Sequence, residues 1–269
     1  MPNVERNGVR IYYEDVGAGP PVVLGHSFLC SGDMWRHQIE PLAESHRVIN
    51  IDQRGHGRSG ALTEPFDLYD MVDDVLAVLD DLGIETAVWA GLSIGGMVAM
   101  RAAIIVPERV SGLILVDTHA GTESPFNKIK YRAMVLGARL MGVRPFLPTI
   151  IQIMFGSTTR RENPDLVDEW AEKLAANQLS SISLTTGALI RRDSVVEILG
   201  GVRLPTAVIV GSEDDTLPEA YSREIVRSLP EASLVVIPEA GHLSSLEQPE
   251  AVIRAMLEFL DGLEEGIGG

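Results

Sequence analysis

A serine between two glycines, Gly91-Leu92-Ser93-Ile94-Gly95, is the stretch of this chain whose residue types and spacing best suit chemistry. An apolar β-type run, Thr86 to Ala90, precedes it, and a run of small residues typical of a helix follows it. A strand that turns this sharply into a helix forces the serine into a sparsely populated backbone conformation and lifts its hydroxyl clear of the sheet. Side chains at the two glycines would crowd that turn. The context predicts a nucleophile at Ser93.

A serine becomes a strong nucleophile only when a base takes its proton and a third group orients that base. His242, in the loop after the last predicted strand, supplies the base, and Asp214, just after the strand Thr206–Val210, supplies the acid. All three side chains follow strands of one predicted sheet, so the same edge of that sheet can gather them. The order serine, aspartate, histidine is that of hydrolases with this turn. We therefore predict a catalytic triad of Ser93, Asp214 and His242.

Neighbouring residues leave alternatives open. Glu213 and Asp215 flank Asp214, and either could orient the histidine in its place. His119 also follows a strand, and we expect it to line the substrate pocket or cap the turn rather than to act as the base. Cys30 lacks a local base and is predicted to be a buried small residue.

Acyl transfer also needs two amides that point at the oxyanion. The amide of Ile94 lies at the predicted start of a helix, where unpaired N–H groups favour negative charge. The second amide is predicted at Phe28, in the loop after the buried strand Val22–Gly25. Phe28 could instead form only a wall of the pocket.

The elements that position these residues alternate between apolar strands and amphipathic helices up to Asp117 and again after Pro205, with one helix predicted over Met34–Ser45. Short, continuously apolar strands are typical of a parallel sheet that helices cover on both faces. An initial hairpin of Val4–Arg6 with Val9–Val16 adds antiparallel strands at one edge. We predict an α/β fold with a mostly parallel, doubly covered sheet of about eight strands.

Residues 118–201 differ from the rest because they contain no convincing strand. Since this block separates two strands, we expect it to lie over their carboxyl ends as a lid. The predicted organisation is a core of residues 1–120 and 201–269, with a helical cap of residues 121–200 inserted before the seventh strand. The apolar spacing predicts cap helices over Tyr131–Met141, Phe146–Phe155, Pro164–Asn177, Ser181–Arg191 and Val195–Leu199.

Most apolar side chains of the predicted cap should pack on the core, and the others should make an apolar substrate wall. Arg191 and Arg192 could bind a substrate carboxylate, but a solvated helix end is the preferred interpretation. The residues expected in the pocket are His119, Trp35, Met154 and Leu243. The cap residues available for the wall are Tyr131, Met134, Leu136, Leu140, Met141, Phe146, Ile150, Ile153, Met154, Phe155 and Trp170.

Charge and cysteine content exclude several classes of partner. The 269 residues include 38 acidic and 22 basic side chains, a formal net charge of −16 at pH 7. This charge repels phosphate backbones and anionic membranes, so neither nucleic acid nor a membrane is an expected partner. A single cysteine, Cys30, excludes an internal disulfide and a cysteine-based zinc site. We see no secretory signal and predict a cytoplasmic protein without metal or cofactor, its oligomeric state left open.

Together these segments resemble the α/β-hydrolase fold superfamily over nearly the whole chain. One departure from its pattern is Ser27, where the family usually has glycine after the histidine. A serine there could narrow the approach or add a hydroxyl near the oxyanion. The matching stretches are Gly25–Phe28, Asp52–Ser59, Gly91–Gly96, Gly211–Asp214 with Pro218, and Ala240–Ser244 with Glu247, Pro249 and Glu250.

Within the superfamily, the lid and the contexts of Asp117-Thr118 and His242-Leu243-Ser244 look most like those of small esterases and lactonases, notably 3-oxoadipate enol-lactonases and acyl-homoserine lactonase-like enzymes. The resemblance implies a serine hydrolase that cleaves carboxylic esters or lactones with a small-to-medium apolar acyl part through an acyl-enzyme. A serine at position 93 argues against the haloalkane dehalogenase and epoxide hydrolase branches, which use aspartate there. The alternatives are a cofactor-free perhydrolase or haloperoxidase with the same triad, and a hydrolase-fold ligand receptor.

Overall fold

One eight-stranded sheet forms the centre of the protein in a computed structural model that describes residues 2–267. Its strand order is β1-β2-β4-β3-β5-β6-β7-β8, with β1 and β2 antiparallel at one edge and the remaining strands parallel to one another. The predicted α/β fold and its mostly parallel sheet are therefore confirmed. The strands are β1 Asn3–Arg6, β2 Val9–Gly17, β3 Pro21–Gly25, β4 Arg47–Asp52, β5 Ala87–Leu92, β6 Val110–Val116, β7 Thr206–Gly211 and β8 Ala232–Ile237.

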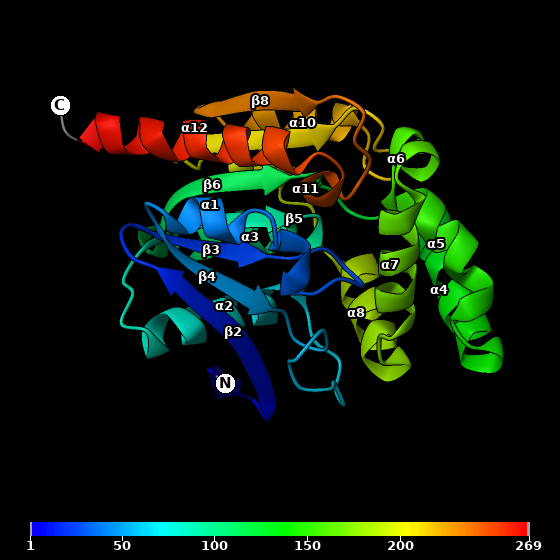
Figure 1. Ribbon diagram of the computed structural model, residues 1–269. Helices are drawn as coiled ribbons and strands as arrows, with labels where there is room; N and C mark the ends of the chain where they lie inside the picture. Colours follow the sequence, from blue (N-terminus) through cyan, green and yellow to red (C-terminus); the bar gives the residue numbers. More distant parts are fainter. Residues whose placement is uncertain (1, 268–269) are drawn as a thin grey trace.

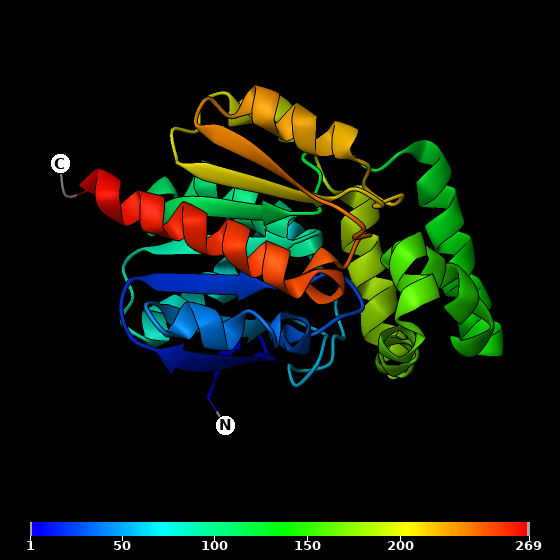
Figure 2. The same cartoon turned by 45° about the horizontal axis from the view of Figure 1, so that its top comes forward.

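Helices cover both faces of the sheet (Figures 1 and 2). Side chains alternate between the faces, as β6 illustrates. Leu113 and Leu115 join the core formed with α2, α3 and α10, whereas Ile114 and Val116 join the core formed with α1 and α12. Both faces are buried, which explains the continuously apolar strands. The helices are α1 Ile39–Ala43, α2 Leu68–Asp81, α3 Ile94–Ile105, α10 Glu219–Ser228 and α12 Pro249–Ile267.

The helix predicted over Met34–Ser45 is wrong as a single element. The structure has a short 3-10 helix, η1 Gly32–Trp35, followed by α1. Pro41 explains the break, because proline cannot donate to the carbonyl of residue 37 and its ring would clash there. Proline is tolerated only in the first turn, so the α-helix begins at Ile39. Two further short elements, η2 Pro107–Arg109 and α11 Ser244–Glu247, were not predicted.

Between β6 and β7 the chain forms a helical insertion at the carboxyl ends of the parallel strands (Figure 1). Its first helix, α4, begins at Pro125 rather than at the predicted Tyr131, because the Ser124 hydroxyl accepts from the amide of Asn127 and proline suits a first turn. The short helix α6 was not predicted. The insertion contains α4 Pro125–Met141, η3 Arg144–Phe146, α5 Leu147–Met154, α6 Ser157–Glu162, α7 Pro164–Ala175, α8 Leu179–Arg191 and α9 Val196–Leu199.

A buried ion pair ties the loop after β4 to α2. Arg54 donates from Nε and Nη2 to the carboxylate of Asp74 at 2.5 and 2.7 Å. Only 5% of the Arg54 side chain and 3% of the Asp74 side chain are exposed. Removing one partner from such a pair leaves the other as an uncompensated buried charge.

Replacing Asp74 with alanine should lower the free energy of unfolding by about 3–5 kcal/mol, measured by urea denaturation, because it strands the Arg54 guanidinium. Asp80→Ala is the matched control. Asp80 pairs with Arg109 at 2.7 Å, but its side chain is 66% exposed, so we expect a loss of about 1 kcal/mol or less. Equal losses in the two variants would show that burial does not determine how much the Arg54–Asp74 pair contributes to the free energy of unfolding.

Candidate active site

Ser93 lies at the turn from β5 into α3 in a strained conformation, with φ 56° and ψ −114°. Two hydrogen bonds from the neighbouring strand hold it there. The Ser93 amide donates to the carbonyl of Val116 at 2.9 Å, and the Ser93 carbonyl accepts from Thr118 Oγ1 at 2.6 Å. Such strain persists only where the surroundings impose it, as they do at many functional sites.

The turn at Ser93 has no room for side chains on its flanking residues. A Cβ at Gly91 would lie 2.2 Å from the carbonyl carbon of Gly95, and a Cβ at Gly95 would lie 2.3 Å from the carbonyl oxygen of Gly25. Both distances are far below van der Waals contact, so only glycine fits. The glycines thus let α3 start directly against the ends of β3 and β5, which fixes the direction of the serine.

His242 and Asp214 form a buried pair. His242 Nδ1 lies 2.8 Å from Asp214 Oδ2, with 3% and 0% of their side chains exposed. The other carboxylate oxygen of Asp214 accepts from the amides of Thr216 and Leu217, each at 2.9 Å. These bonds fix the orientation of the carboxylate, so that its other oxygen faces the imidazole.

The two carboxylates that flank Asp214 lie elsewhere. Glu213 accepts from the amide of Thr158 at 2.8 Å and from the Ser157 hydroxyl at 2.9 Å, at the start of α6. Asp215 is exposed. Of the three acidic residues considered from the sequence, the structure therefore places Asp214 against His242.

Residues 154–158, from the end of α5 to the start of α6, are held by the loops that carry His242 and Asp214, and we call this segment the α5–α6 junction. Besides the Glu213 contacts, the amide of Leu243 donates to the carbonyl of Met154 at 3.1 Å. The amide of Gly156 donates to Glu247 Oε2 at 2.8 Å, and a Cβ at Gly156 would lie 2.8 Å from the amide of Gly241. The insertion is thereby joined to both loops.

A second carboxylate, Asp117, lies under this pair. It is fully buried at the end of β6, with a positive φ of 44°. It accepts from the amide of Gly211 at 2.7 Å and from the Ser244 hydroxyl, so it connects β7 to the loop of His242. Burial and the nearby Asp214 raise the pKa of Asp117 well above its usual value. From the sequence, Asp117 was expected at a strand end, in a context similar to that of small esterases, but no role was predicted for its side chain.

Burial alone would lower the pKa of His242, but the charges of Asp214 and Asp117 and the hydrogen bond that Asp214 accepts from the imidazole outweigh it. The pKa of His242 is therefore raised above 6.5. The carboxylates favour the imidazolium, which is the form that a general base reaches after taking a proton.

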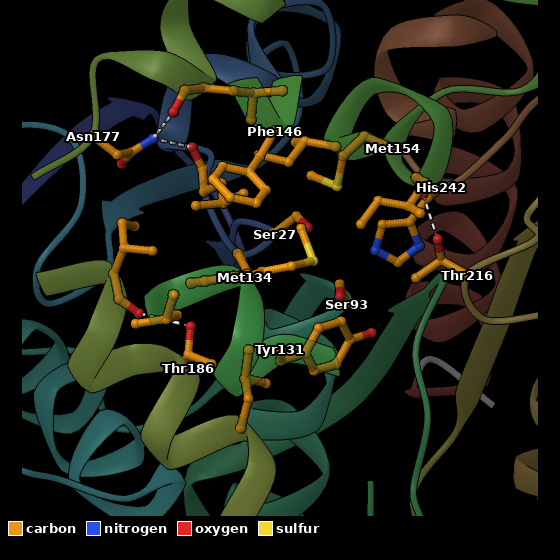
Figure 3. Close-up of a pocket in the computed structure, with 18 of the residues that line it drawn as sticks. Ser27, Ser93, Tyr131, Met134, Phe146, Met154, Asn177, Thr186, Thr216 and His242 are labelled. Atoms are coloured by element: carbon orange, nitrogen blue, oxygen red, sulfur yellow. Dashed lines mark hydrogen bonds between the residues drawn. The ribbon is translucent and has the colours of Figure 1, made fainter. Parts of the chain in front are cut away.

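Ser93 and His242 line a cavity of about 150 Å³ between the sheet and the insertion (Figure 3). No hydrogen bond joins the Ser93 hydroxyl to any other residue that the structure describes, His242 included. Catalytic hydrogen bonds of this kind often tighten only when substrate binds. The wall is chiefly apolar, with Phe28, Leu29 and Met97 from the core and Met134, Phe146, Ile150, Ile153 and Met154 from the insertion.

Only some of the residues expected in the pocket line the cavity. Met154 lines the cavity, but Trp35 and Leu243 have no exposed surface and pack in the core beneath the sheet. Trp35 is the last residue of η1, and both Trp35 and its neighbour Met34 are fully buried in that core. His119 faces a second, polar hollow, whose wall shares Glu123, Tyr131, Thr216 and Leu217 with the cavity.

Arg192 corrects the expectation of a solvated helix end, although Arg191 is exposed as expected. Arg192 lines the cavity with 2% of its side chain exposed, and its Nη1 lies 3.0 Å from Glu123 Oε2. Its Nε donates to the carbonyl of Gly121 at 2.9 Å and its Nη2 to His119 Nδ1 at 3.3 Å. Glu123 therefore compensates the guanidinium charge. Burial and the Arg192 charge lower the pKa of His119 to about 4.

Two backbone amides were predicted to point at the oxyanion. Ile94 is the first residue of α3, so its amide has no partner within the helix. Phe28 lines the cavity in a tight turn in which Cys30 donates to the carbonyl of Ser27 at 3.1 Å and Leu29 has a φ of 66°. The Ser27 hydroxyl is buried in the same wall and has no hydrogen-bond partner among the described residues.

These features define an α/β-hydrolase, and the chain belongs to the alpha/beta hydrolase fold family, whose model matches residues 20–249. It is similar to a thermophilic esterase from Thermogutta terrifontis, with 31% identity, a TM-score of 0.92, and coverage of 98% of this chain and 99% of that one. It also resembles 3-oxoadipate enol-lactonase 2 of Acinetobacter baylyi, with 29% identity over 88% of this chain and 87% of that protein. Est816, described as an N-acyl homoserine lactone degrading enzyme, shows 29% identity and a TM-score of 0.84, covering 96% of this chain and 100% of its own.

The geometry around His242 predicts how its imidazole titrates. NMR of the imidazole should give a pKa above 6.5 in the wild type. Asp214→Asn should lower it, because the substitution removes the nearest negative charge and leaves the effect of burial. Asp215→Asn is the matched control and should leave the titration unchanged, since Asp215 is exposed. A similar shift in both variants would contradict the assignment of Asp214 as the partner.

Proposed function

We propose that this protein hydrolyses carboxylic esters or lactones through an acyl-enzyme on Ser93. The observation that carries the proposal is the convergence of a strained serine and a buried histidine–aspartate pair on one apolar cavity. The esterase and lactonase relatives support the same class of reaction. The predicted division into core and cap, and the cytoplasmic location, stay predictions.

In the proposed mechanism each residue has one role. Ser93 Oγ attacks the carbonyl carbon while the Nε2 atom of His242 takes the hydroxyl proton. His242 then protonates the leaving alkoxide, and water activated by the same nitrogen releases the acid. Asp214 holds Nδ1 and stabilises the imidazolium, and the amides of Ile94 and Phe28 bind the oxyanion.

The cavity favours an acyl part that is small to medium in size and uncharged. A cavity of about 150 Å³ can hold a group the size of benzene. Its walls are apolar, and its one guanidinium, that of Arg192, is paired with Glu123. A substrate carboxylate would have to displace Glu123 to reach that charge, so neutral acyl groups are the better fit.

A fluorophosphonate or a sulfonyl fluoride should modify Ser93, as identified by peptide mass spectrometry. Ser93→Ala should abolish labelling and lower the hydrolysis of p-nitrophenyl esters by about 10⁴-fold or more, because the nucleophile is removed. Ser228→Ala on α10 is a control that should keep full activity. Full activity of the Ser93 variant would refute the mechanism. Peroxide-dependent halide oxidation without ester or lactone hydrolysis would replace this function with the haloperoxidase alternative.

We further propose that the Ser27 hydroxyl is an additional oxyanion donor. A buried hydroxyl without a partner costs stability, so its presence needs an explanation. Ser27 directly precedes Phe28, whose amide is one of the two proposed donors, and it lies in the wall that contains Ser93. A hydroxyl in this position can rotate toward the developing negative charge.

Ser27→Ala should therefore lower kcat by about 10- to 100-fold, the value of a hydrogen bond to a charged group, with little change in KM. The same substitution should leave the midpoint of urea unfolding unchanged or raise it, because it removes an unsatisfied buried group. Ser245→Ala, a buried serine outside the cavity, is the control and should leave kcat unchanged. An unchanged kcat in Ser27→Ala would show that the hydroxyl takes no part.

A further inference from the structure

The outer side of α4 carries a stripe of exposed apolar side chains, which we call the α4 stripe. It consists of Phe126, Ile129, Leu136 and Leu140, with exposures of 75%, 69%, 59% and 77%. Ala133, also exposed, fills the gap so that the residues follow one another at intervals of three and four. Met141, the last residue of α4, is also 64% exposed, whereas the other exposed large apolar side chains of the described residues are scattered over several elements. Contiguous patches of this kind mark interaction sites.

α4 also has a charge opposite to that of the whole chain. It carries Lys128, Lys130, Arg132 and Arg139 and no acidic residue, in a protein with a net charge of −16. At about 100° of turn per residue, Lys130 lies on one side of the α4 stripe, and Arg132 and Arg139 lie on the other. No described carboxylate pairs with any of these four side chains, and Arg139 donates only to the Ser183 hydroxyl at 3.3 Å.

The opposite side of the same helix faces the substrate cavity. Tyr131, Met134 and Ala138 line it at the same three-and-four spacing. α4 itself lies at the end of the molecule furthest from the C-terminus (Figures 1 and 2). This single helix therefore separates the proposed catalytic cavity from the α4 stripe.

We propose that the α4 stripe docks on the surface of an anionic lipid aggregate. An apolar helix face flanked by lysine and arginine is typical of helices that lie in the plane of a lipid interface. The flanking cations can reach anionic headgroups while the apolar side chains enter the acyl boundary. No helix within residues 2–267 is long and apolar enough to cross a bilayer. In the proposed contact α4 lies along the lipid surface.

Docking by α4 departs from the expectation of no membrane partner that the net charge gave. The whole chain repels an anionic membrane, but charge at a surface acts over about a Debye length, roughly 8 Å at physiological salt. Over that range α4 presents only cations beside the α4 stripe. Docking by α4 would also bring the cavity close to a lipid phase in which apolar esters dissolve, a benefit that rests on the proposed function.

A second copy of this chain is the competing occupant, because intervals of three and four also suit a helix–helix seam. The flanking charges oppose it. In a symmetric pair of α4 helices, Lys130, Arg132 and Arg139 of one copy would face cations of the other across the seam. An anionic lipid surface would instead attract these cations. The observations therefore favour lipid over a second copy of the chain.

Flotation with vesicles tests the proposal without any need for turnover, so it fails independently of the proposed function. The wild type should float with vesicles of equal parts phosphatidylglycerol and phosphatidylcholine, and much less with phosphatidylcholine alone or at high salt. Ile129→Glu with Leu140→Glu should reduce binding by about tenfold or more, because two apolar anchors are lost. Lys130→Gln with Arg132→Gln should reduce it by about fivefold for each cation removed.

Ile105→Glu with Ile198→Glu is the matched control, since these side chains are 44% and 52% exposed on other helices. It adds the same two charges and should bind vesicles as the wild type does. All variants should retain the wild-type unfolding midpoint. Absence of wild-type binding, or equal binding to vesicles of either composition, would overturn the proposal. So would a dimer, measured by light scattering, that the Ile129 and Leu140 substitutions dissociate while vesicles have no effect.

Discussion

The close contact of backbones at the start of α3 is the constraint on which the rest of the site depends. Gly91 and Gly95 let the helix begin against β3 and β5 with no side chain between them. Ser93 is then left with φ 56°, a conformation that Thr118 and Val116 hold from the neighbouring strand. Without this contact the hydroxyl would have no fixed direction, and the buried histidine–aspartate pair would have nothing to act on.

The buried titratable groups around that contact all have partners. Asp214 meets His242, Asp117 accepts two hydrogen bonds beneath them, and Glu123 compensates Arg192 in the cavity wall. Removing one partner would be costly, because it would leave a buried charge or a buried polar group unpaired. The cavity can therefore be apolar as a whole while a few polar groups remain at fixed positions.

Much of the fold was predictable, because periodicity and chain order are local properties of the sequence. The strands follow from continuous apolar runs, and the positions of Ser93, Asp214 and His242 follow from their places just after strands. What the sequence could not decide depends on contacts between distant segments. Arg192 lies next to a second arginine that is exposed, and only the approach of α8 to Glu123 distinguishes the two. Trp35 has the side chain of a pocket residue, but it packs in a core built with α1 and α12, and α12 is far from it in the chain.

The α5–α6 junction limits how an enzyme of this kind could diversify. Two of its anchors are immediate chain neighbours of the proposed acid and base, since Glu213 precedes Asp214 and Leu243 follows His242. Replacing the whole insertion with one from another protein would release both loops at the same time. The proposed alignment of Asp214 and His242 with Ser93 would then be disturbed. New substrate ranges should therefore arise through substitutions on the inner sides of α4 and α5, with residues 154–158 retained as the graft boundary.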